Sequence, residues 1–347
     1  MPDAAYASRL DALRDWVAAR HDLPADRLRL ELAAGDASFR RYFRAWLADG
    51  STRILMDAPP EHEDSRPFVA IASDWRAAGL PVPTLHALDL DAGFIELEDL
   101  GDTPMHLLLG DEDSEATLAC EERALALLDV LQNRAPAAPL PAYDAPLLGR
   151  ELDLFPEWCL GRFLNIETPP GWQRHRQRLI ETAVAQPRVA VHRDFDAMNL
   201  MVHAEQLWLI DFQDAVSGPL TYDLISLLRG RYCRFSRPRF VAWVEAFRQR
   251  AIADGRLPEH VDCDTFLHMA DAMAAQRSLK VLGIFCRLTL RDAKSGYLER
   301  LPRFLDHLRD SLAPWPDYAE LLDWLDTTFA PALTRALAQH AHRGAST

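Results

Sequence analysis

The sequence predicts an α+β protein with two lobes, a small lobe built on an antiparallel sheet and a larger, mainly helical lobe. Three observations support this prediction. The chain has 347 residues and 49% hydrophobic composition, which is enough to bury a sizeable core and to split into two lobes. Between residues 28 and 57 apolar and polar side chains alternate as in strands. Beyond Gly101 apolar residues recur at helical spacing instead.

The small lobe is expected to hold one sheet between two helices. Apolar spacing predicts a helix at 5–20, and a second helix at 65–78 is ended by Gly79 with prolines behind it. The five expected strands span residues 28–32, 41–47, 53–57, 84–88 and 94–98. We place the small lobe at 1–98, with a hinge at about 94–101, and the large lobe at 99–347.

The large lobe is expected to be helical except for two short strands, at 188–191 and 206–210. A helix at 172–185 leads through Pro187 into a strand at 188–191. Downstream, a helix opens near Tyr222. Further helices are expected at 240–249, 265–287 and 298–312.

The acidic composition limits the partners of the chain. With 38 Lys and Arg against 52 Asp and Glu, the formal net charge is −14, whereas a nucleic-acid surface needs a basic stripe. The charge leaves room for a cationic substrate, although acidic composition also serves solubility. We therefore expect a small-molecule substrate and no nucleic-acid partner.

The apolar segments and the cysteines predict a cytosolic protein without membrane association. No apolar run approaches the length of a membrane span, and the first residues carry Asp3 where a signal peptide would be basic. The five cysteines lie far apart, with no C-x-x-C pair, and are expected to be buried thiols in a reducing compartment. The oligomeric state stays open.

The segment VHRDFDAMNLMVHAEQLWLIDFQD, residues 191–214, carries the chemistry. Asp194 follows the expected strand, Asn199 comes five residues later, and Asp211 ends a second apolar strand. An isolated Asp after a strand is most often a turn or cap residue. Three such groups in order within one window make coincidence the minority interpretation. The three residues supply one carboxylate that can deprotonate a hydroxyl and two oxygen ligands for Mg²⁺. Phosphoryl transfer from a nucleoside triphosphate requires these groups at this spacing.

At these residues the chain resembles the protein-kinase-like superfamily and its aminoglycoside phosphotransferase branch. The resemblance implies ATP and Mg²⁺ as cofactors, Asp194 as the catalytic base, and Asn199 and Asp211 as metal ligands. It also gives His192 a structural role and matches Asp223 to the buried Asp that anchors the catalytic loop. An Asp near a helix start is also favoured by capping alone.

The resemblance places the nucleotide against the first strands. Aligning Ser38 with the tip of the phosphate-covering loop puts Tyr42 over the adenine and Met56 where a phosphate-binding Lys is normal. The chain has only two lysines, Lys280 and Lys294, so that Lys is absent. The two arginines that could replace it are Arg40 and, as the alternative, Arg44, although either could be a solvated strand residue. The expected hinge carries Glu96 and Glu98 and would bind adenine through its backbone.

Five segments resemble one subfamily, the bacterial anomeric kinases that phosphorylate N-acetylmuramate and N-acetylglucosamine at C1 in cell-wall recycling. The segments are GDASFRRYFR, LMDAPP, HRDFDAMN, DFQDA and LGIF. The resemblance suggests Asp214 for sugar hydroxyls and Arg193 or Arg287 for a lactyl carboxylate. Most antibiotic kinases have Gly at the position of Arg193, which makes drug resistance a less favoured role.

Two other functions stay open. One is a kinase for another hydroxylated or amino substrate, such as an aminoglycoside, choline, homoserine or fructosamine. The other is a nucleotide-binding pseudokinase that acts as an interaction module. The missing Lys favours the pseudokinase, whereas the intact Asp194, Asn199 and Asp211 oppose it more strongly.

Overall fold

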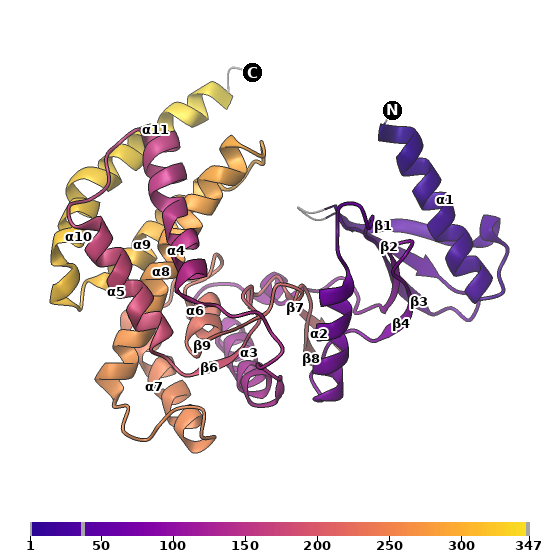
Figure 1. Ribbon diagram of the computed structural model, residues 1–347, viewed down its shortest axis with the longest axis horizontal. Helices are drawn as coiled ribbons and strands as arrows, with labels where there is room; N and C mark the ends of the chain where they lie inside the picture. The colour runs from indigo at the N-terminus through magenta and orange to yellow at the C-terminus, as the bar shows by residue number, and fades with distance from the viewer. Residues whose placement is uncertain (1, 36–38, 345–347) are drawn as a thin grey trace. The chain divides into compact units, whose positions relative to one another are not determined.

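The computed structural model describes residues 2–35 and 39–344 and divides into two compact units (Figure 1). Unit 1 comprises Met1–Pro104 together with Asn199–Asp214, and unit 2 comprises Met105–Met198 and Ala215–Thr347. Segment 199–214, which the sequence division assigned to the large lobe, thus makes its contacts within unit 1.

Unit 1 is built on an antiparallel sheet with the strand order β1-β2-β3-β5-β4. Its five strands are β1 (Arg29–Gly35), β2 (Arg41–Trp46), β3 (Thr52–Asp57), β4 (Leu85–Asp89) and β5 (Phe94–Glu98). Helix α1 (Pro2–Arg20) buries Leu13 and Val17 against Phe43 and Leu55 of the sheet. The side chains that alternate inward along β2 and β3 therefore form one core with α1.

Helix α2 (Arg66–Ala77) and a hairpin complete unit 1. The hairpin pairs β7 (Leu200–His203) with β8 (Gln206–Leu209), and the backbone N–H of Leu209 donates to the carbonyl of Pro81 at 2.8 Å. The sequence analysis expected β8 and missed β7. Strand β7 has three apolar residues in succession, so it shows no alternation of apolar and polar side chains.

Unit 2 is helical apart from the two-stranded sheet of β6 (Arg188–Val191) and β9 (Val216–Pro219). The helices are α3 (Glu115–Arg134), α4 (Ala145–Leu154), α5 (Trp172–Val184), α6 (Tyr222–Leu228), α7 (Arg237–Ala253), α8 (Cys263–Leu290), α9 (Leu301–Leu312), α10 (Ala319–Trp324) and α11 (Ala330–Gly344). Segment Phe155–Leu164 continues α4 as a π-helix. The predicted α+β class is confirmed, while β9 and the π-helix were not foreseen.

Helix α8 is the central element of unit 2, with α4, α5, α7 and α9 around it (Figure 1). Gly283 lets it approach the end of α4, because a Cβ at this position would lie 2.4 Å from the carbonyl carbon of Leu154. Any larger residue would push the two helices apart. The close approach matters because α4 and α8 each carry charged side chains toward the loop after β6.

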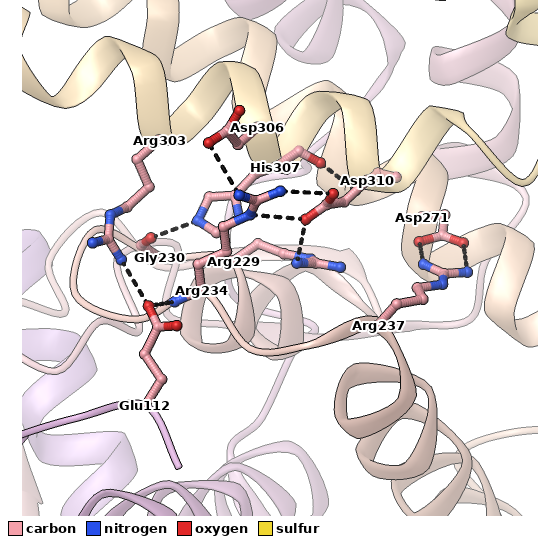
Figure 2. A network of polar contacts seen from close by, with 11 residues as sticks. Glu112, Arg229, Gly230, Arg234, Arg237, Asp271, Arg303, Asp306, His307 and Asp310 are labelled. Atoms are coloured by element: carbon pink, nitrogen blue, oxygen red, sulfur yellow. Dashed lines mark hydrogen bonds and ion pairs between the residues drawn. The ribbon is translucent and has the colours of Figure 1, made fainter. Parts of the chain in front are cut away.

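A network of ion pairs ties segment 229–237, which follows α6, to α8 and α9 (Figure 2). Arg234 donates to Asp310 at 3.0 and 3.1 Å, and Arg237 forms a two-pronged pair with Asp271 at 2.6 and 2.7 Å. The buried ring of His307 lies 3.0 Å from the carbonyl oxygen of Gly230, measured from Nε2. These contacts hold the end of α6 in place.

All five cysteines are free thiols, and four of them are buried. Within residues 2–35 and 39–344, no helix has both the length and the hydropathy required to cross a bilayer.

Candidate active site

Asp194 lies in the loop that follows β6, and helix α6 holds this loop through its backbone. Asp223, in α6, accepts hydrogen bonds from the backbone N–H of His192 at 2.6 Å and from that of Arg193 at 3.0 Å. The His192 side chain is fully buried, whereas Asp194 is exposed. The two residues before Asp194 are therefore fixed, and its carboxylate projects from a rigid support.

Burial is the main cause of the pKa shift of Asp223. Its side chain is fully buried, and burial raises its pKa to about 6, while His192 and the two backbone hydrogen bonds act in the opposite direction. The carboxylate is therefore mainly ionised at neutral pH. In this form it accepts stronger hydrogen bonds from the two backbone N–H groups than a neutral carboxyl group would.

Arg193 adopts a backbone conformation that glycine prefers. Its φ is 79°, in the left-handed region, where a residue with a Cβ is strained by about 1–3 kcal/mol. Its guanidinium donates to Glu151 of α4 at 2.7 Å. The residue that departs from the Gly of most antibiotic kinases therefore keeps the glycine conformation and adds a side-chain contact.

Glu151 is the centre of a buried polar cluster that the sequence analysis missed. Lys280 of α8 lies 3.0 Å from its carboxylate, and Tyr143 donates its hydroxyl hydrogen to it. Burial alone would raise the pKa of Glu151, but Lys280 and Arg193 lower it to about 2. One sequence signal could have identified the cluster: Lys280 interrupts the apolar stretch from Leu279 to Phe285, and a buried lysine needs an anionic partner.

Arg277, one turn before Lys280 in α8, reaches the same loop. Its Nη1 donates to the carbonyl oxygen of Arg193 at 3.3 Å, and its guanidinium lies 4.7 Å from the ring centroid of Tyr222. Burial lowers the pKa of Arg277, but Tyr222 and Asp194 raise it above its ordinary value. A cation thus lies within one peptide unit of Asp194.

The two expected metal ligands, Asn199 and Asp211, flank the β7–β8 hairpin in unit 1. Leu200 pairs with Leu209, and the backbone N–H of the next residue, Ile210, donates to the carbonyl of Asn199 at 3.1 Å. The hairpin thereby brings the two positions to the same open end. Asp211 has a φ of 64°, and its Oδ1 accepts a hydrogen bond from the Gln213 side chain at 2.7 Å.

The donor set at the open end of this hairpin fits Mg²⁺. Amide and carboxylate oxygens are the hard ligands that Mg²⁺ prefers, and it normally takes its other ligands from water and phosphate. The described part of the chain contains no group of three or more His, Cys, Asp or Glu side chains that could hold a metal by themselves. Asn199 and Asp211 therefore suit a metal ion that arrives with a nucleotide.

Phe212 fixes the residue next to Asp211. Its ring is fully buried and stacks on Phe68 of α2, with centroids 5.1 Å apart and planes 7° from parallel. Trp75 of the same helix contacts it at 5.4 Å. Removing this ring from water anchors the chain on one side of Asp211.

The expected phosphate-binding arginines have different surroundings. Arg40 is buried and pairs with Glu63 at 3.4 Å. Arg44 is held by Asp99 at 2.6 Å and by Asp102 at 2.8 Å, and hydrogen bonds to Asp102 and Asp99 raise its pKa. The guanidinium of Arg44 is thus already neutralised by two carboxylates.

The remaining nucleotide positions fall on β2 and β5. Tyr42 pairs across the sheet with Met56, which is fully buried, and Ser38 lies outside the described residues. Glu96 is buried and lies 3.0 Å from the His21 ring and 3.3 Å from the Arg20 guanidinium. Glu98 accepts two hydrogen bonds from Thr84, at 2.6 and 3.0 Å. Both carboxylates have protein partners, and the backbone of β5 pairs with β3 on one side and with β4 on the other.

The two other expected sugar contacts lie on different units. Asp214 is exposed at the end of unit 1. Arg287 is partly buried in α8, three turns beyond Arg277, and its Nε has no hydrogen-bond partner among the described residues.

Residues 29–260 match the model of the phosphotransferase enzyme family, and the chain belongs to that family. Kinases of this family use ATP and a divalent metal ion.

Curated relatives narrow the comparison. The chain is 42% identical over 296 residues to the N-acetylmuramate/N-acetylglucosamine kinase of Pseudomonas putida, covering 84% of this chain and 86% of that protein. It is 39% identical over 302 residues to the enzyme of the same name from Neisseria meningitidis serogroup B, covering 86% and 89%.

Solved structures share the fold at low identity. A Plasmodium vivax ethanolamine kinase matches with a TM-score of 0.62 at 8% identity, over 84% of this chain and 85% of that one. A choline/ethanolamine kinase family protein from Mesorhizobium loti matches with a TM-score of 0.56 at 16% identity, over 91% and 98%. These likenesses support the protein-kinase-like fold predicted from the sequence.

Proposed function

We propose that this chain transfers the γ-phosphoryl group of ATP to the anomeric C1 hydroxyl of N-acetylmuramate, N-acetylglucosamine or both. The observation that carries the proposal is the name shared by the relatives, which are 39–42% identical over more than four-fifths of each chain. The reaction takes place in the cytoplasm, where it serves cell-wall recycling. The acidic surface, with its formal charge of −14, suits a small-molecule substrate better than nucleic acid.

Asp194 accepts the proton of the C1 hydroxyl as that oxygen attacks the γ-phosphorus. Its exposed carboxylate, on a loop fixed through His192 and Arg193, suits this task. An anomeric hydroxyl is more acidic than an ordinary alcohol, so modest assistance suffices. A general base contributes roughly 10²- to 10⁴-fold, and positioning and charge neutralisation supply most of the remainder.

Asn199 and Asp211 hold Mg²⁺ through their side-chain oxygens. The bound ion supplies positive charge at the phosphate oxygens, where negative charge develops during transfer. Asn199 is buried and Phe212 is stacked on α2, so the chain on both sides of this pair is held.

Arg40 neutralises the triphosphate in place of the missing Lys. Arg44, the alternative, is held by Asp99 at 2.6 Å and Asp102 at 2.8 Å. Arg40 is paired with Glu63 at the longer distance of 3.4 Å, which supports Arg40 as the phosphate ligand. Ser38 and Tyr42 complete the nucleotide site. The hinge segment 94–101 binds adenine through its backbone.

Asp214 binds sugar hydroxyls, and Arg287 or Arg193 binds the lactyl carboxylate when the sugar is N-acetylmuramate. Arg287 is the stronger candidate of the two, because the Arg193 guanidinium is paired with Glu151.

The position of the phosphate tests the proposal. The purified protein, ATP and Mg²⁺ are incubated with each sugar, and the product is examined by ³¹P and ¹H NMR. A C1 phosphate couples to the anomeric proton, is labile to mild acid and blocks reducing-end chemistry. The methyl glycosides, which lack a free C1 hydroxyl, should be inert. Turnover of a methyl glycoside at the rate of the free sugar, or a clear preference for an aminoglycoside or choline, would refute the anomeric assignment.

The metal assignment is tested by Asp211→Asn, with Asp292→Asn as the control. Asp292 is a carboxylate paired with the neighbouring Arg291 beyond the end of α8. Asp211→Asn should keep the fold, weaken Mg-ATP binding and abolish turnover, while Asp292→Asn should match the parent. Unchanged Mg²⁺ dependence in Asp211→Asn would remove this residue from the site. Nucleotide binding by the parent without turnover of any acceptor would indicate a pseudokinase.

A further inference from the structure

Arg193, the residue before Asp194, is restrained by three helices of unit 2. The N–H of Arg193 donates to Asp223 of α6, and its carbonyl accepts from Arg277 of α8 at 3.3 Å. Its guanidinium donates to Glu151 of α4 at 2.7 Å. Every polar group of this residue is therefore held, and each by a different helix.

The restraint matters because the conformation is not one that arginine adopts by itself. At a φ of 79° Arg193 would relax toward an ordinary backbone region if nothing opposed it, and the next residue would turn with it. That next residue is Asp194, whose carboxylate must meet a substrate hydroxyl at hydrogen-bond distance.

Glu151 is itself unable to turn away from Arg193. Its carboxylate accepts from Tyr143 and lies 3.0 Å from the Lys280 ammonium, and Lys280 in turn donates to the Tyr222 hydroxyl at 2.9 Å. Glu151 is 5% exposed and Lys280 is 8% exposed. A carboxylate that is buried and held by several donors has one orientation.

We propose that Glu151 and Arg277 are positioning residues for phosphoryl transfer, which hold Arg193 in its left-handed conformation and thereby aim Asp194. The proposal rests on the proposed function, in which Asp194 is the base. Neither residue touches the substrate in this role. Glycine at position 193 would adopt the same backbone conformation without strain and would have no use for Glu151.

A double-mutant cycle tests this proposal. The four proteins are the parent, Glu151→Gln, Arg193→Gly and the double variant, and the measured quantities are kcat, the KM for ATP and the melting temperature. In the parent background Glu151→Gln should lower kcat by about 10- to 100-fold, with little change in the KM for ATP. In the Arg193→Gly background the same substitution should change kcat by less than about threefold, because the strained arginine is gone.

An equal loss of kcat in both backgrounds would overturn the proposal, since Glu151 would then act independently of Arg193. The matched control is Asp271→Asn, which also removes a buried carboxylate paired with an arginine. It should lower the melting temperature and leave kcat unchanged. If Glu151→Gln does not fold, Arg277→Met and Arg277→Lys replace it. Arg277→Met should lower kcat, and Arg277→Lys, which keeps a donor for the carbonyl, should recover part of it.

Failure of the proposal and failure of the proposed function can be told apart. The cycle is run on whichever acceptor the parent phosphorylates, so an incorrect sugar assignment does not affect it. Asp194→Asn is measured beside it. If Asp194→Asn retains the parent kcat, the role of Asp194 is refuted, and with it the role of its positioning residues.

Discussion

Arg193 and Arg229 both extend to a carboxylate on another helix of unit 2, and the pKa values of the two guanidinium groups are shifted in opposite directions. Burial lowers the pKa of Arg193, but Glu151 more than offsets it, and the pKa is raised. Burial also lowers the pKa of Arg229, here to about 10, because Asp310 and Asp271 only partly compensate. Arg229 is the more deeply buried of the two, with 2% of its surface exposed.

The difference comes from how well each guanidinium is paired. Arg193 donates to Glu151 at 2.7 Å, whereas Arg229 lies 3.4 Å from Asp310, and its Nε and Nη2 are buried without a hydrogen-bond partner in the described part of the chain. Asp310 also binds Arg234 at 3.0 Å (Figure 2). The partners of Arg193 therefore hold its guanidinium in one conformation. Arg229 is held mainly by packing, with its guanidinium 4.2 Å from the ring centroid of Phe240. We expect changes near Arg193 to affect catalysis and changes near Arg229 to affect stability.

The largest effect is expected at the loop itself. Asp194→Asn should lower kcat by roughly 10²- to 10⁴-fold, because the acceptor of the hydroxyl proton is lost, while Mg-ATP still binds. Steady-state kinetics with ATP titration measures both quantities. Asp310→Asn, in the network of Arg229, should retain the parent kcat. Near-native turnover by Asp194→Asn would mean that the loop had been misinterpreted.

The next effect is on stability. Arg237→Met would remove the two-pronged pair with Asp271 (Figure 2). The fully buried carboxylate of Asp271 would keep the hydrogen bond from the Trp315 indole N–H, at 3.0 Å. Breaking a buried pair in this way typically costs about 3–5 kcal/mol in the free energy of unfolding. Urea unfolding measures it, and kcat per folded molecule should not change. A loss below about 1 kcal/mol would show that the pair is solvated.

Acidification should act on the same network through His307. Burial, followed by the charge of Arg229, lowers the pKa of His307 from 6.5 to about 3. The folded state therefore favours the neutral ring, and this contribution to stability is present above about pH 6.5 and is lost as the pH falls toward 3. Each pH unit in that window costs at most about 1.4 kcal/mol. The melting temperature of the parent should fall between pH 7 and pH 5 more steeply than that of His307→Gln, and parallel curves would contradict the assignment.

The smallest effect is expected from Arg229→Met. Replacing a poorly paired buried cation by an apolar side chain of similar length should change the free energy of unfolding by less than about 1 kcal/mol, or stabilise the fold. Arg234 remains to pair with Asp310. Arg193→Met should instead lower kcat. If the two substitutions had equal effects on stability and catalysis, the contrast between the two regions would be lost.

Part of the fold could be predicted because some strands and helices are indicated by patterns of neighbouring residues in the sequence. The five strands of the unit 1 sheet span five to seven residues each, and all five were located within a few positions. Strand β7 has three apolar residues in succession and β9 ends in Gly218 and Pro219, so neither has a pattern that indicates a strand. The π-helix at Phe155–Leu164 continues α4 without a break that composition could reveal.

The sequence alone pointed to the proposed chemistry, because Asp194, Asn199 and Asp211 lie within one short segment whose spacing is itself the signal. Only the tertiary structure decided what supports that segment. Glu151 lies 42 residues before Arg193, and Arg277 lies 84 residues after it, so no periodicity connects them. The sign of each pKa shift was likewise beyond the sequence. Arg193 and Arg229 are the same residue type. The packed helices bring acceptors to each guanidinium, and the number and distance of these acceptors decide whether its pKa is raised or lowered.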